Sequence, residues 1–271
     1  MDAELTLTKI STPLANCISV RVGRLDPEVL DRLALGKYDQ APVLNAEGLP
    51  IGVLGTVQAK ELMSSGRTLE EASDLISKNW IPAETTIREL LHALADQPFA
   101  LVQDYQGQSV ALITLSDLNR HYFRRLLYAL FAELEASAAR LVDVELGDPK
   151  MWIPLLSEES QVRVLGYWEL GKMRNVDIGP VPSCTLTDLL RLVRKVPGIL
   201  QELGLTKKQY EEMSGQLPDW RNRVMHPVRP LVLSPGDVKK LGVALESSRS
   251  MANKIRARLG DHGIDWRAPW L

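Results

Sequence analysis

The sequence has few of the residues that build metal clusters and disulfide scaffolds. It contains two cysteines, Cys17 and Cys184, and four histidines among 271 residues. These are too few for a disulfide framework, a cysteine-based zinc site or a multi-histidine metal cluster, so we expect no metal site. It also lacks any apolar run close to the roughly 20 residues that span a bilayer. We therefore expect no membrane partner.

The sequence also lacks a large excess of charge of either sign, with 32 Lys and Arg against 34 Asp and Glu. The net charge is −2, which excludes a uniformly basic protein that coats nucleic acid. Residues 1–25 lack a basic segment followed by an apolar one, so we expect no secretion signal and a cytoplasmic location. Residues 1–120 hold 10 Lys and Arg against 16 Asp and Glu, whereas 121–271 hold 22 against 18. With the chain length, this asymmetry predicts two modules with different partners.

The N-terminal module, residues 1–120, contains an internal repeat. Two apolar runs around Asn45–Gly48 predict a β-hairpin, and two more around Asp104–Gly107 predict another. An offset of 59 residues superposes Gly48 on Gly107 and residues 51–54 on 110–113. Helical spacing precedes each hairpin, at 26–35 and at 85–95. The pattern predicts two copies of one β-α-β-β-α unit packed together.

The stretches QAPVLNAEGLPIGVLGTVQAKEL and FALVQDYQGQSVALITLSDL resemble the end of a CBS motif, where a hairpin leads into a helix. The tandem is similar to one CBS pair over residues 10–120. This resemblance implies a sensor that binds an adenine nucleotide of the AMP, ADP or ATP type between the repeats. It also implies pairing of two copies through this module.

The candidate nucleotide-binding residues are Thr114 and Asp117. They match the family's Thr or Ser followed three residues later by Asp, and a carboxylate there can accept both ribose hydroxyls. The helix N-terminus beside it offers free amides to a phosphate. The same two residues also match a capping box that starts a helix, which stays as the alternative. The first repeat has Gly55 and Gln58 at these positions, or Thr56 and Ala59 with a one-residue shift, and neither alignment supplies the Asp. We therefore expect one site per pair.

From His121 onward the pattern is wholly helical and predicts an all-α bundle for residues 121–271. Helices are expected at 121–141, 158–173, 187–196, 206–216, 219–226 and 234–259, with Pro197 and Pro218 as breaks. The helix that closes the first module is expected to continue into the one at His121. The predicted fold class is thus α+β, with a CBS pair followed by a helical bundle.

The most informative segment of the bundle is Arg221-Asn222-Arg223-Val224-Met225-His226. It is similar to the R-N-x3-H motif of HEPN domains, helical bundles of this length, many of which are metal-independent ribonucleases. The resemblance implies RNA as partner, no catalytic cofactor and a two-fold dimer whose copies line one cleft. Glu135 resembles an acidic position of the family, with Glu133 nearby as the other register.

These residue types suit RNA cleavage by the 2′-hydroxyl. A histidine with a pKa near about 6.5 serves as acid or base at neutral pH, here His226. Arg221 offers a planar fork of donors to a phosphate, and Asn222 orients the histidine or the phosphate. Asn222 and His226 share one face of a helix, while Arg221 lies about 140° around from His226. In a two-fold dimer, Arg221 of one copy can lie near the site that contains His226 of either copy.

Three other interpretations stay open. The motif could be a solvated helix face, in which Arg221 and Arg223 pair with Glu211, Glu212 or Asp219. The bundle could be an inactive dimerisation or RNA-binding platform switched by a nucleotide. The chain could also be a toxin or defence component with an antitoxin partner. The basic residues of the last helix, from Lys239 to Arg258, suit an RNA backbone and a charged solvated face equally well.

Overall fold

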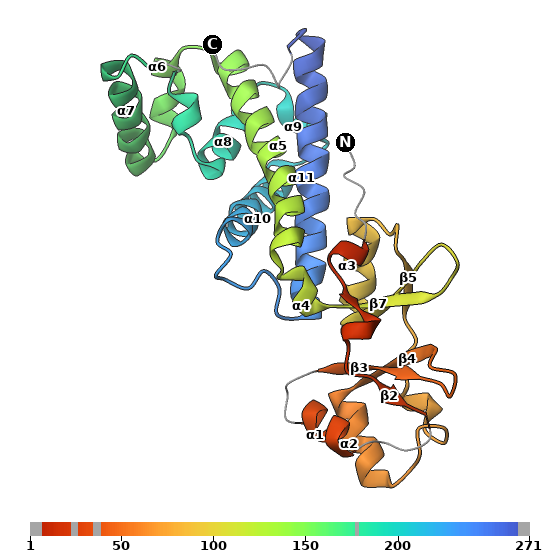
Figure 1. Ribbon diagram of the computed structural model, residues 1–271. Helices are drawn as coiled ribbons and strands as arrows, with labels where there is room; N and C mark the ends of the chain where they lie inside the picture. Colours follow the sequence, from red (N-terminus) through yellow and green to blue (C-terminus); the bar gives the residue numbers. More distant parts are fainter. Residues whose placement is uncertain (1–6, 23–26, 35–38, 177–178, 265–271) are drawn as a thin grey trace. The chain divides into compact units, whose positions relative to one another are not determined.

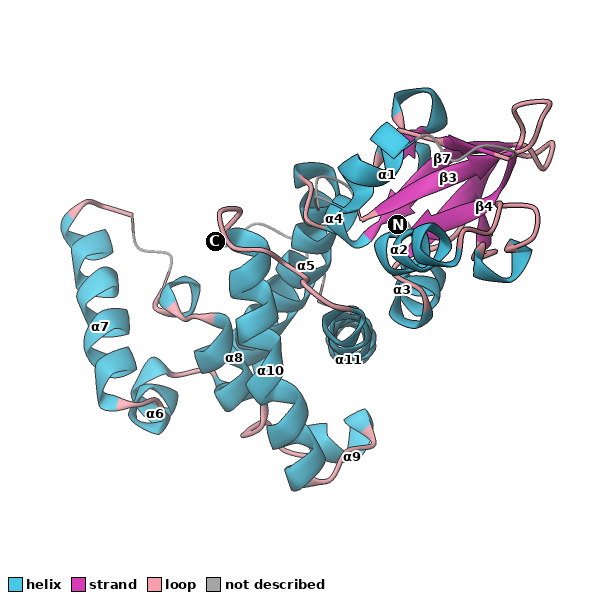
Figure 2. Ribbon diagram, turned by 90° about the horizontal axis from the view of Figure 1, so that it is seen from below, coloured by secondary structure: helices cyan, strands magenta, loops and turns pink. Residues whose placement is uncertain are grey.

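The computed structural model describes the chain apart from residues 1–6, 23–26, 35–38, 177–178 and 265–271 (Figure 1). Its residues divide into two compact units. The first unit contains Met1–Phe123 and Val232–Lys240, and the second contains Arg124–Leu231 and Leu241–Leu271. The fold is α+β, and every strand among the described residues belongs to the first unit (Figure 2).

The first unit contains the two predicted β-α-β-β-α repeats. The first repeat is β2 (Val20–Arg21), α1 (Pro27–Ala34), β3 (Gln40–Leu44), β4 (Pro50–Gly55) and α2 (Thr56–Ser65). The second is β5 (Trp80–Pro82), α3 (Ile87–Asp96), β6 (Phe99–Gln103), β7 (Ser109–Thr114) and α4 (Leu115–Leu118). In each repeat the first strand is parallel to the second, and the hairpin strands are antiparallel.

The 59-residue offset is confirmed in the strand register. Gln40 pairs with Gly55 in the first hairpin, and Phe99 pairs with Thr114 in the second. Both hairpins shift register at the same place, after Val43 and after Val102. The two turns are built alike, because Gly48 and Gly107 both have a left-handed φ, of 84° and 76°.

The two repeats exchange edge pairing. The short strand β1 (Thr12–Pro13) precedes the first repeat but pairs with β7 of the second, so one sheet has the order β1-β7-β6-β5. Ser77 precedes the second repeat but forms a bridge to Val53 in β4 of the first, whose sheet has the order β2-β3-β4. The repeats are therefore tied together by main-chain hydrogen bonds as well as by side chains.

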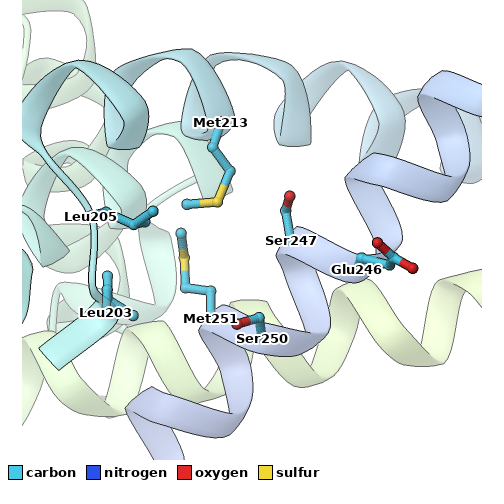
Figure 3. Close-up of a pocket in the computed structure, with 7 residues that line it drawn as sticks. All are labelled: Leu203, Leu205, Met213, Glu246, Ser247, Ser250 and Met251. Carbon is cyan, nitrogen blue, oxygen red and sulfur yellow. The ribbon is translucent and has the colours of Figure 1, made fainter.

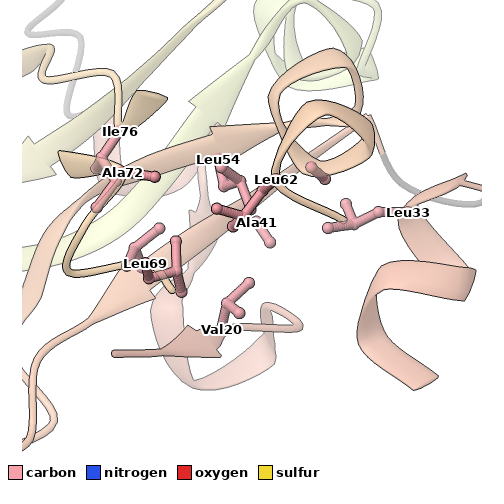
Figure 4. Close-up of a cluster of buried hydrophobic side chains, with 10 residues drawn as sticks. Val20, Leu33, Ala41, Leu54, Leu62, Leu69, Ala72 and Ile76 are labelled. Atoms are coloured by element: carbon pink, nitrogen blue, oxygen red, sulfur yellow. The ribbon is translucent and has the colours of Figure 1, made fainter. Parts of the chain in front are cut away.

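The apolar core of the first repeat forms between its sheet and its helices. Figure 4 shows this cluster, in which Leu33 of α1 and Leu62 of α2 lie over Ala41 and Leu54 of the sheet. A second cluster contains Val53, Phe99, Leu101 and Leu112, and thus residues of both sheets. Burial of these side chains holds each repeat and the pair together.

All regular elements of the second unit, among its described residues, are helices. Its elements are α5 (His121–Leu146), α6 (Pro149–Trp152), the 3-10 helix η4 (Ile153–Leu155), α7 (Glu158–Met173), the 3-10 helix η5 (Val181–Ser183), α8 (Leu186–Val193), α9 (Ile199–Leu203), α10 (Lys207–Met225) and α11 (Pro235–Asp261). Ion pairs join α5 to α11, from Glu133 to Arg256 at 3.1 Å and from Glu145 to Arg258. The division between the units falls inside α5 and again inside α11.

Two expected helix boundaries are wrong. The segments 206–216 and 219–226 form one continuous helix, α10, with Pro218 inside it. A proline removes one backbone hydrogen bond, and here the burial of Leu217 and Trp220 on either side of it holds the helix together. The helix at 187–196 is shorter than expected and is followed by α9, which the sequence pattern did not predict.

The connection between the modules also differs from expectation. Helix α4 ends at Leu118 and α5 begins at His121, so no continuous helix closes the first repeat pair. Asn119 lies in the break and uses its side-chain amide twice. It donates to the Val232 carbonyl at 2.9 Å and accepts from the Val232 N–H at 3.1 Å. This clip is one reason why Val232–Lys240 belongs with the first unit.

Candidate functional site

The R-N-x3-H residues lie at the C-terminal end of α10. Arg221 and Asn222 lie in its last turns, and His226 is the first residue beyond the helix. The backbone N–H of His226 donates to the Asn222 carbonyl at 3.0 Å, which closes the last helical turn. Trp220 and Val224 are buried and fasten this end of the helix, while Asn222 and His226 are exposed.

Arg221 is paired with Glu135 of α5. Its Nη2 lies 3.2 and 3.3 Å from the two carboxylate oxygens, and its Nε lies 3.4 Å from one of them. Both side chains are partly exposed, at 30% and 27%. Glu133, the other register, pairs with Arg256 instead. Among the described residues no hydrogen bond uses Nη1 of Arg221, so the N–H groups of that nitrogen can donate to another acceptor.

The ion pairs expected if the motif is a solvated helix face are wrong, because Glu211 and Glu212 have other partners. Glu211 pairs with Arg194 of α8, and Glu212 lies 3.9 Å from Lys208. Arg223 lies over the Trp220 ring at 4.8 Å from its centroid. These contacts leave Arg221 as the one arginine of the motif that is joined to another helix by a carboxylate.

A buried arginine braces the segment that carries His226. Arg124 of α5 is 4% exposed and donates to two carbonyls, those of Arg223 and Arg229. One carbonyl belongs to the last turn of α10 and the other to the loop beyond it, so the two contacts flank residues 224–228, which include His226. Burial lowers the pKa of Arg124, yet an arginine stays charged under these conditions.

The His226 imidazole itself makes no hydrogen bond or ion pair to any residue that the structure describes. His226 and Asn222, four residues before it, are both exposed. The basic last helix is less available to an RNA backbone than its composition indicates. Arg256 pairs with Glu133, Arg258 pairs with Glu145 and Glu202, and Lys254 donates to the Leu203 carbonyl.

Thr114 and Asp117 form the capping box of α4. The Asp117 Oδ2 accepts from the Thr114 N–H at 2.7 Å and from its hydroxyl at 3.1 Å. The other oxygen, Oδ1, lies 3.0 Å from Arg120 and 3.5 Å from the Thr12 hydroxyl. Arg120 also donates to Thr12 at 2.9 Å. These contacts confirm the capping box, which was the alternative to nucleotide binding for these two residues.

The four acceptor positions of the Asp117 carboxylate are all occupied by these contacts. The side chain is 2% exposed. Burial raises the pKa of Asp117 above its usual value, although the hydrogen bonds from Thr114 and Thr12 and the charge of Arg120 oppose that rise. A ribose could bind this carboxylate only by replacing Thr12 and Arg120 at Oδ1. Gly55, the first repeat's counterpart of Thr114, carries no capping side chain.

The described residues contain no group of His, Cys, Asp and Glu that could hold a metal ion. A pocket of about 270 Å³ lies between the α9–α10 segment and α11, with Leu203, Met213, Glu246 and Met251 among the residues around it (Figure 3). None of the predicted site residues lines it. No helix in the described part of the chain has both the length and the apolarity to cross a membrane.

Arg124 and Asn119 were not identified from the sequence. Arg124 falls on the spacing of the buried stripe of α5, which continues through Leu127, Phe131 and Leu134, all fully or nearly fully buried. A charged residue on an apolar stripe is a signal of a buried partner, and it could have identified Arg124. No local pattern marks Asn119, because its partner Val232 is 113 residues away in the sequence.

No protein-family model and no curated protein matches this sequence. Among solved structures, a CBS domain protein from Shewanella oneidensis MR-1 is 20% identical, covers 42% of this chain and 93% of its own, and has a TM-score of 0.35. The CBS domain of a bacterial CNNM/CorC family Mg²⁺ transporter, solved with ATP, is 23% identical (42% and 84% covered, TM-score 0.36). CbpB, solved with c-di-AMP, is 19% identical (46% and 89% covered, TM-score 0.37).

Proposed function

We propose that this protein is a metal-independent endoribonuclease of the HEPN type, regulated by an adenine nucleotide at an N-terminal CBS pair. The observation that carries the first part is the end of α10. There an exposed His226 lies four residues after an exposed Asn222, and Glu135 binds Nε and Nη2 of Arg221 but not Nη1. This arrangement supplies a proton carrier and a phosphate-binding fork without a metal.

The reaction is transesterification within the RNA. The 2′-oxygen attacks the adjacent phosphorus, the bond from phosphorus to the 5′-oxygen breaks, and the products are a 2′,3′-cyclic phosphate and a 5′-hydroxyl. His226 as imidazole accepts the 2′-hydroxyl proton, or as imidazolium it donates a proton to the leaving oxygen. Arg221 binds the phosphate oxygens as negative charge grows on them, and Asn222 orients the imidazole or the phosphate.

The test is RNA cleavage in EDTA by the wild-type protein beside His226→Ala. His92→Ala is the matched control, because His92 is an exposed histidine on α3, in the first unit. We expect His226→Ala to lose about 10²–10⁴-fold in rate, the range of general acid–base catalysis, and His92→Ala to keep the wild-type rate. Products ending in a cyclic phosphate would identify the reaction. Equal cleavage by His226→Ala and wild type would disprove the assignment.

One observation favours a second candidate, an inactive platform that binds RNA or a second copy. The Glu135 carboxylate neutralises part of the Arg221 charge that a phosphate would need. RNA binding without cleavage by any variant would support this platform. The toxin or defence role with an antitoxin stays a prediction, which co-purification of a partner from the native source would test.

The second part of the proposal concerns the nucleotide. Its support is the duplicated β-α-β-β-α unit with Asp117 at the N-terminus of α4, together with the charge of Arg120 beside it. Binding there requires ribose hydroxyls to replace Thr12 and Arg120 at the carboxylate, which would free the Arg120 guanidinium for a phosphate.

Calorimetry with ATP, AMP and c-di-AMP tests this site in the full chain. Asp117→Asn is expected to weaken binding at least about ten-fold, the loss of roughly 1.4 kcal/mol. The control is Gln58→Ala at the matching position of the first repeat, which should leave the affinity unchanged. Unchanged affinity in Asp117→Asn would show that the nucleotide binds at another site. The absence of a binding heat with all three nucleotides would contradict the proposal that this protein binds an adenine nucleotide.

A further inference from the structure

Helix α7 has apolar residues on two opposite faces. One face packs within the second unit, where Val164 is fully buried and Arg163 pairs with Asp188 at the start of α8. The opposite face is exposed, with Val162 at 74%, Leu170 at 39% and Met173 at 82%. In both views α7 lies at the periphery of its unit, with one side uncovered by that unit (Figures 1 and 2).

The exposed residues form one stripe. At 100° per residue, Val162, Leu170 and Met173 lie within about 80° of one another, opposite the buried Val164. A surface helix ordinarily has a polar outer face, so a second apolar stripe indicates a contact with another molecule.

Gly166 lies in the middle of this stripe. It is four residues from Val162 and four from Leu170, halfway along the helix. A β-carbon added at Gly166 would meet nothing within 4 Å, so packing within this chain does not require a glycine there. Glycine weakens a helix interior, and its use at an exposed midpoint suits the close approach of a second backbone.

The charges at the two ends of α7 have opposite signs. Glu158 and Glu159 lie in the first turn, and Lys172 and Arg174 lie at the last turn and its cap. Between the ends, Arg163 pairs with Asp188, and Glu169 lies 2.9 Å from Lys172. Within the described residues, Glu158, Glu159 and Arg174 form no ion pair. A partner with charge of one sign would match one end and repel the other. An antiparallel copy of the same helix matches both ends at once.

We infer that α7 forms a two-fold contact with α7 of a second copy of this chain, with the axis beside Gly166. In that arrangement Val162 of each copy lies opposite Leu170 of the other copy. The acidic end of each helix lies against the basic end of its mate. Such an isologous contact closes at two copies and does not propagate. It stands apart from the ribonuclease proposal, since neither RNA nor His226 takes part in it.

Sedimentation of the full chain at micromolar concentration tests the stripe. The variant is Val162→Glu with Leu170→Glu, and the matched control is Leu49→Glu with Tyr105→Glu, two exposed apolar residues in the hairpin turns of the first unit. We expect a dimeric wild type and control, and a dimer dissociation constant at least ten-fold higher for the α7 variant. A monomeric wild type, or a dimer that the α7 variant leaves intact, would overturn the inference.

Cross-linking tests the axis. In a Cys17→Ser, Cys184→Ala background, Gly166→Cys should form a symmetric disulfide-linked dimer on oxidation. Gly215→Cys is the control, because Gly215 is also an exposed helical glycine with nothing within 4 Å of an added β-carbon. Equal cross-linking of the two variants would contradict the position of the axis.

Charge exchange tests the polarity of the pairing. Glu159→Arg alone and Arg174→Glu alone should each weaken the dimer, and the two together should restore it. Restoration is not expected from a general loss of helix stability, which the second substitution would deepen. Failure of the double variant to recover would overturn the antiparallel assignment.

Discussion

The Arg221 guanidinium of α10 is joined to the Glu135 carboxylate of α5 through Nε and Nη2, at 3.2 to 3.4 Å. The two residues are 86 positions apart in the sequence. This pairing restrains the rotamer of Arg221 and leaves the Nη1 N–H groups without an acceptor among the described residues. An arginine oriented in advance loses less side-chain freedom when it binds a phosphate, which is the role that we propose for it.

Loss of Glu135 should therefore reduce RNA cleavage more than it reduces stability. We expect Glu135→Ala to lower the cleavage rate at least about ten-fold, because misplaced catalytic groups cost rate steeply. Its free energy of unfolding should fall by only about 0.5–1 kcal/mol, since the pair is partly exposed. Glu133→Ala, which breaks the neighbouring pair with Arg256, is the control and should keep the wild-type rate. A faster Glu135→Ala enzyme would show that the carboxylate inhibits Arg221.

Arg124 should contribute far more to stability than its neighbour. Arg124→Ala leaves the carbonyls of Arg223 and Arg229 without their donor in a buried place, so we expect a loss of about 2–4 kcal/mol by urea denaturation. Arg125→Ala, at an exposed position on the same helix, should change stability by less than about 0.5 kcal/mol. Amide exchange at residues 223–229 should accelerate in the Arg124 variant alone. Equal effects of the two variants would contradict the bracing role.

The repeat was predictable from the sequence because its signals are local. Asn45 and Asp104 each accept from the backbone across their turn, Leu49 N–H and Gln108 N–H at 2.7 and 2.9 Å, and the turn glycines follow at fixed spacing. The same offset then carries over to the strands, since a turn sets the register of its hairpin.

The errors and omissions concern contacts between distant residues. Pro218 indicates a break when the sequence is read locally, but the burial of Leu217 and Trp220 on either side of it keeps α10 continuous. The choice of Glu135 over Glu133 depends on how α10 lies across α5, which no spacing within either helix reveals. For Asp117, the sequence predicted both of its roles, and only the structure places Thr12 and Arg120 at its second oxygen.

Gly52 should be indispensable to the pairing between the repeats. A β-carbon at Gly52 would lie 2.4 Å from Ile76 Cγ2 and 2.8 Å from the Ser77 carbonyl oxygen, inside the bridge between Val53 and Ser77. We expect Gly52→Ala to destabilise the protein by about 1–3 kcal/mol, the usual range for overpacking. Gly215→Ala makes the same change in an open helical position and should be neutral or stabilising by up to about 1 kcal/mol. Urea denaturation compares the two, and equal losses would contradict the close approach.

Asp188 should make the helical unit sensitive to acid. Burial raises its pKa, but hydrogen bonds from Ser160 and Thr185 and the Arg163 charge outweigh burial and hold the pKa below its usual value. A carboxyl with a lowered folded-state pKa stabilises the fold above its unfolded pKa of about 3.9, and this contribution is lost as the pH falls through the folded value. Asp188→Asn should therefore cost about 1–3 kcal/mol at pH 7 and progressively less below pH 4.

The measurement is the difference in unfolding free energy between variant and wild type at each pH from 7 to 3, which cancels the titration of other groups. Asp143→Asn is the control, because Asp143 is exposed and lies 3.6 Å from Arg140 on the same helix. Its difference should stay below about 0.5 kcal/mol across the range. A difference for Asp188→Asn that stays constant down to pH 3 would mean that the lost contacts, and not the charge of the carboxylate, stabilise the start of α8.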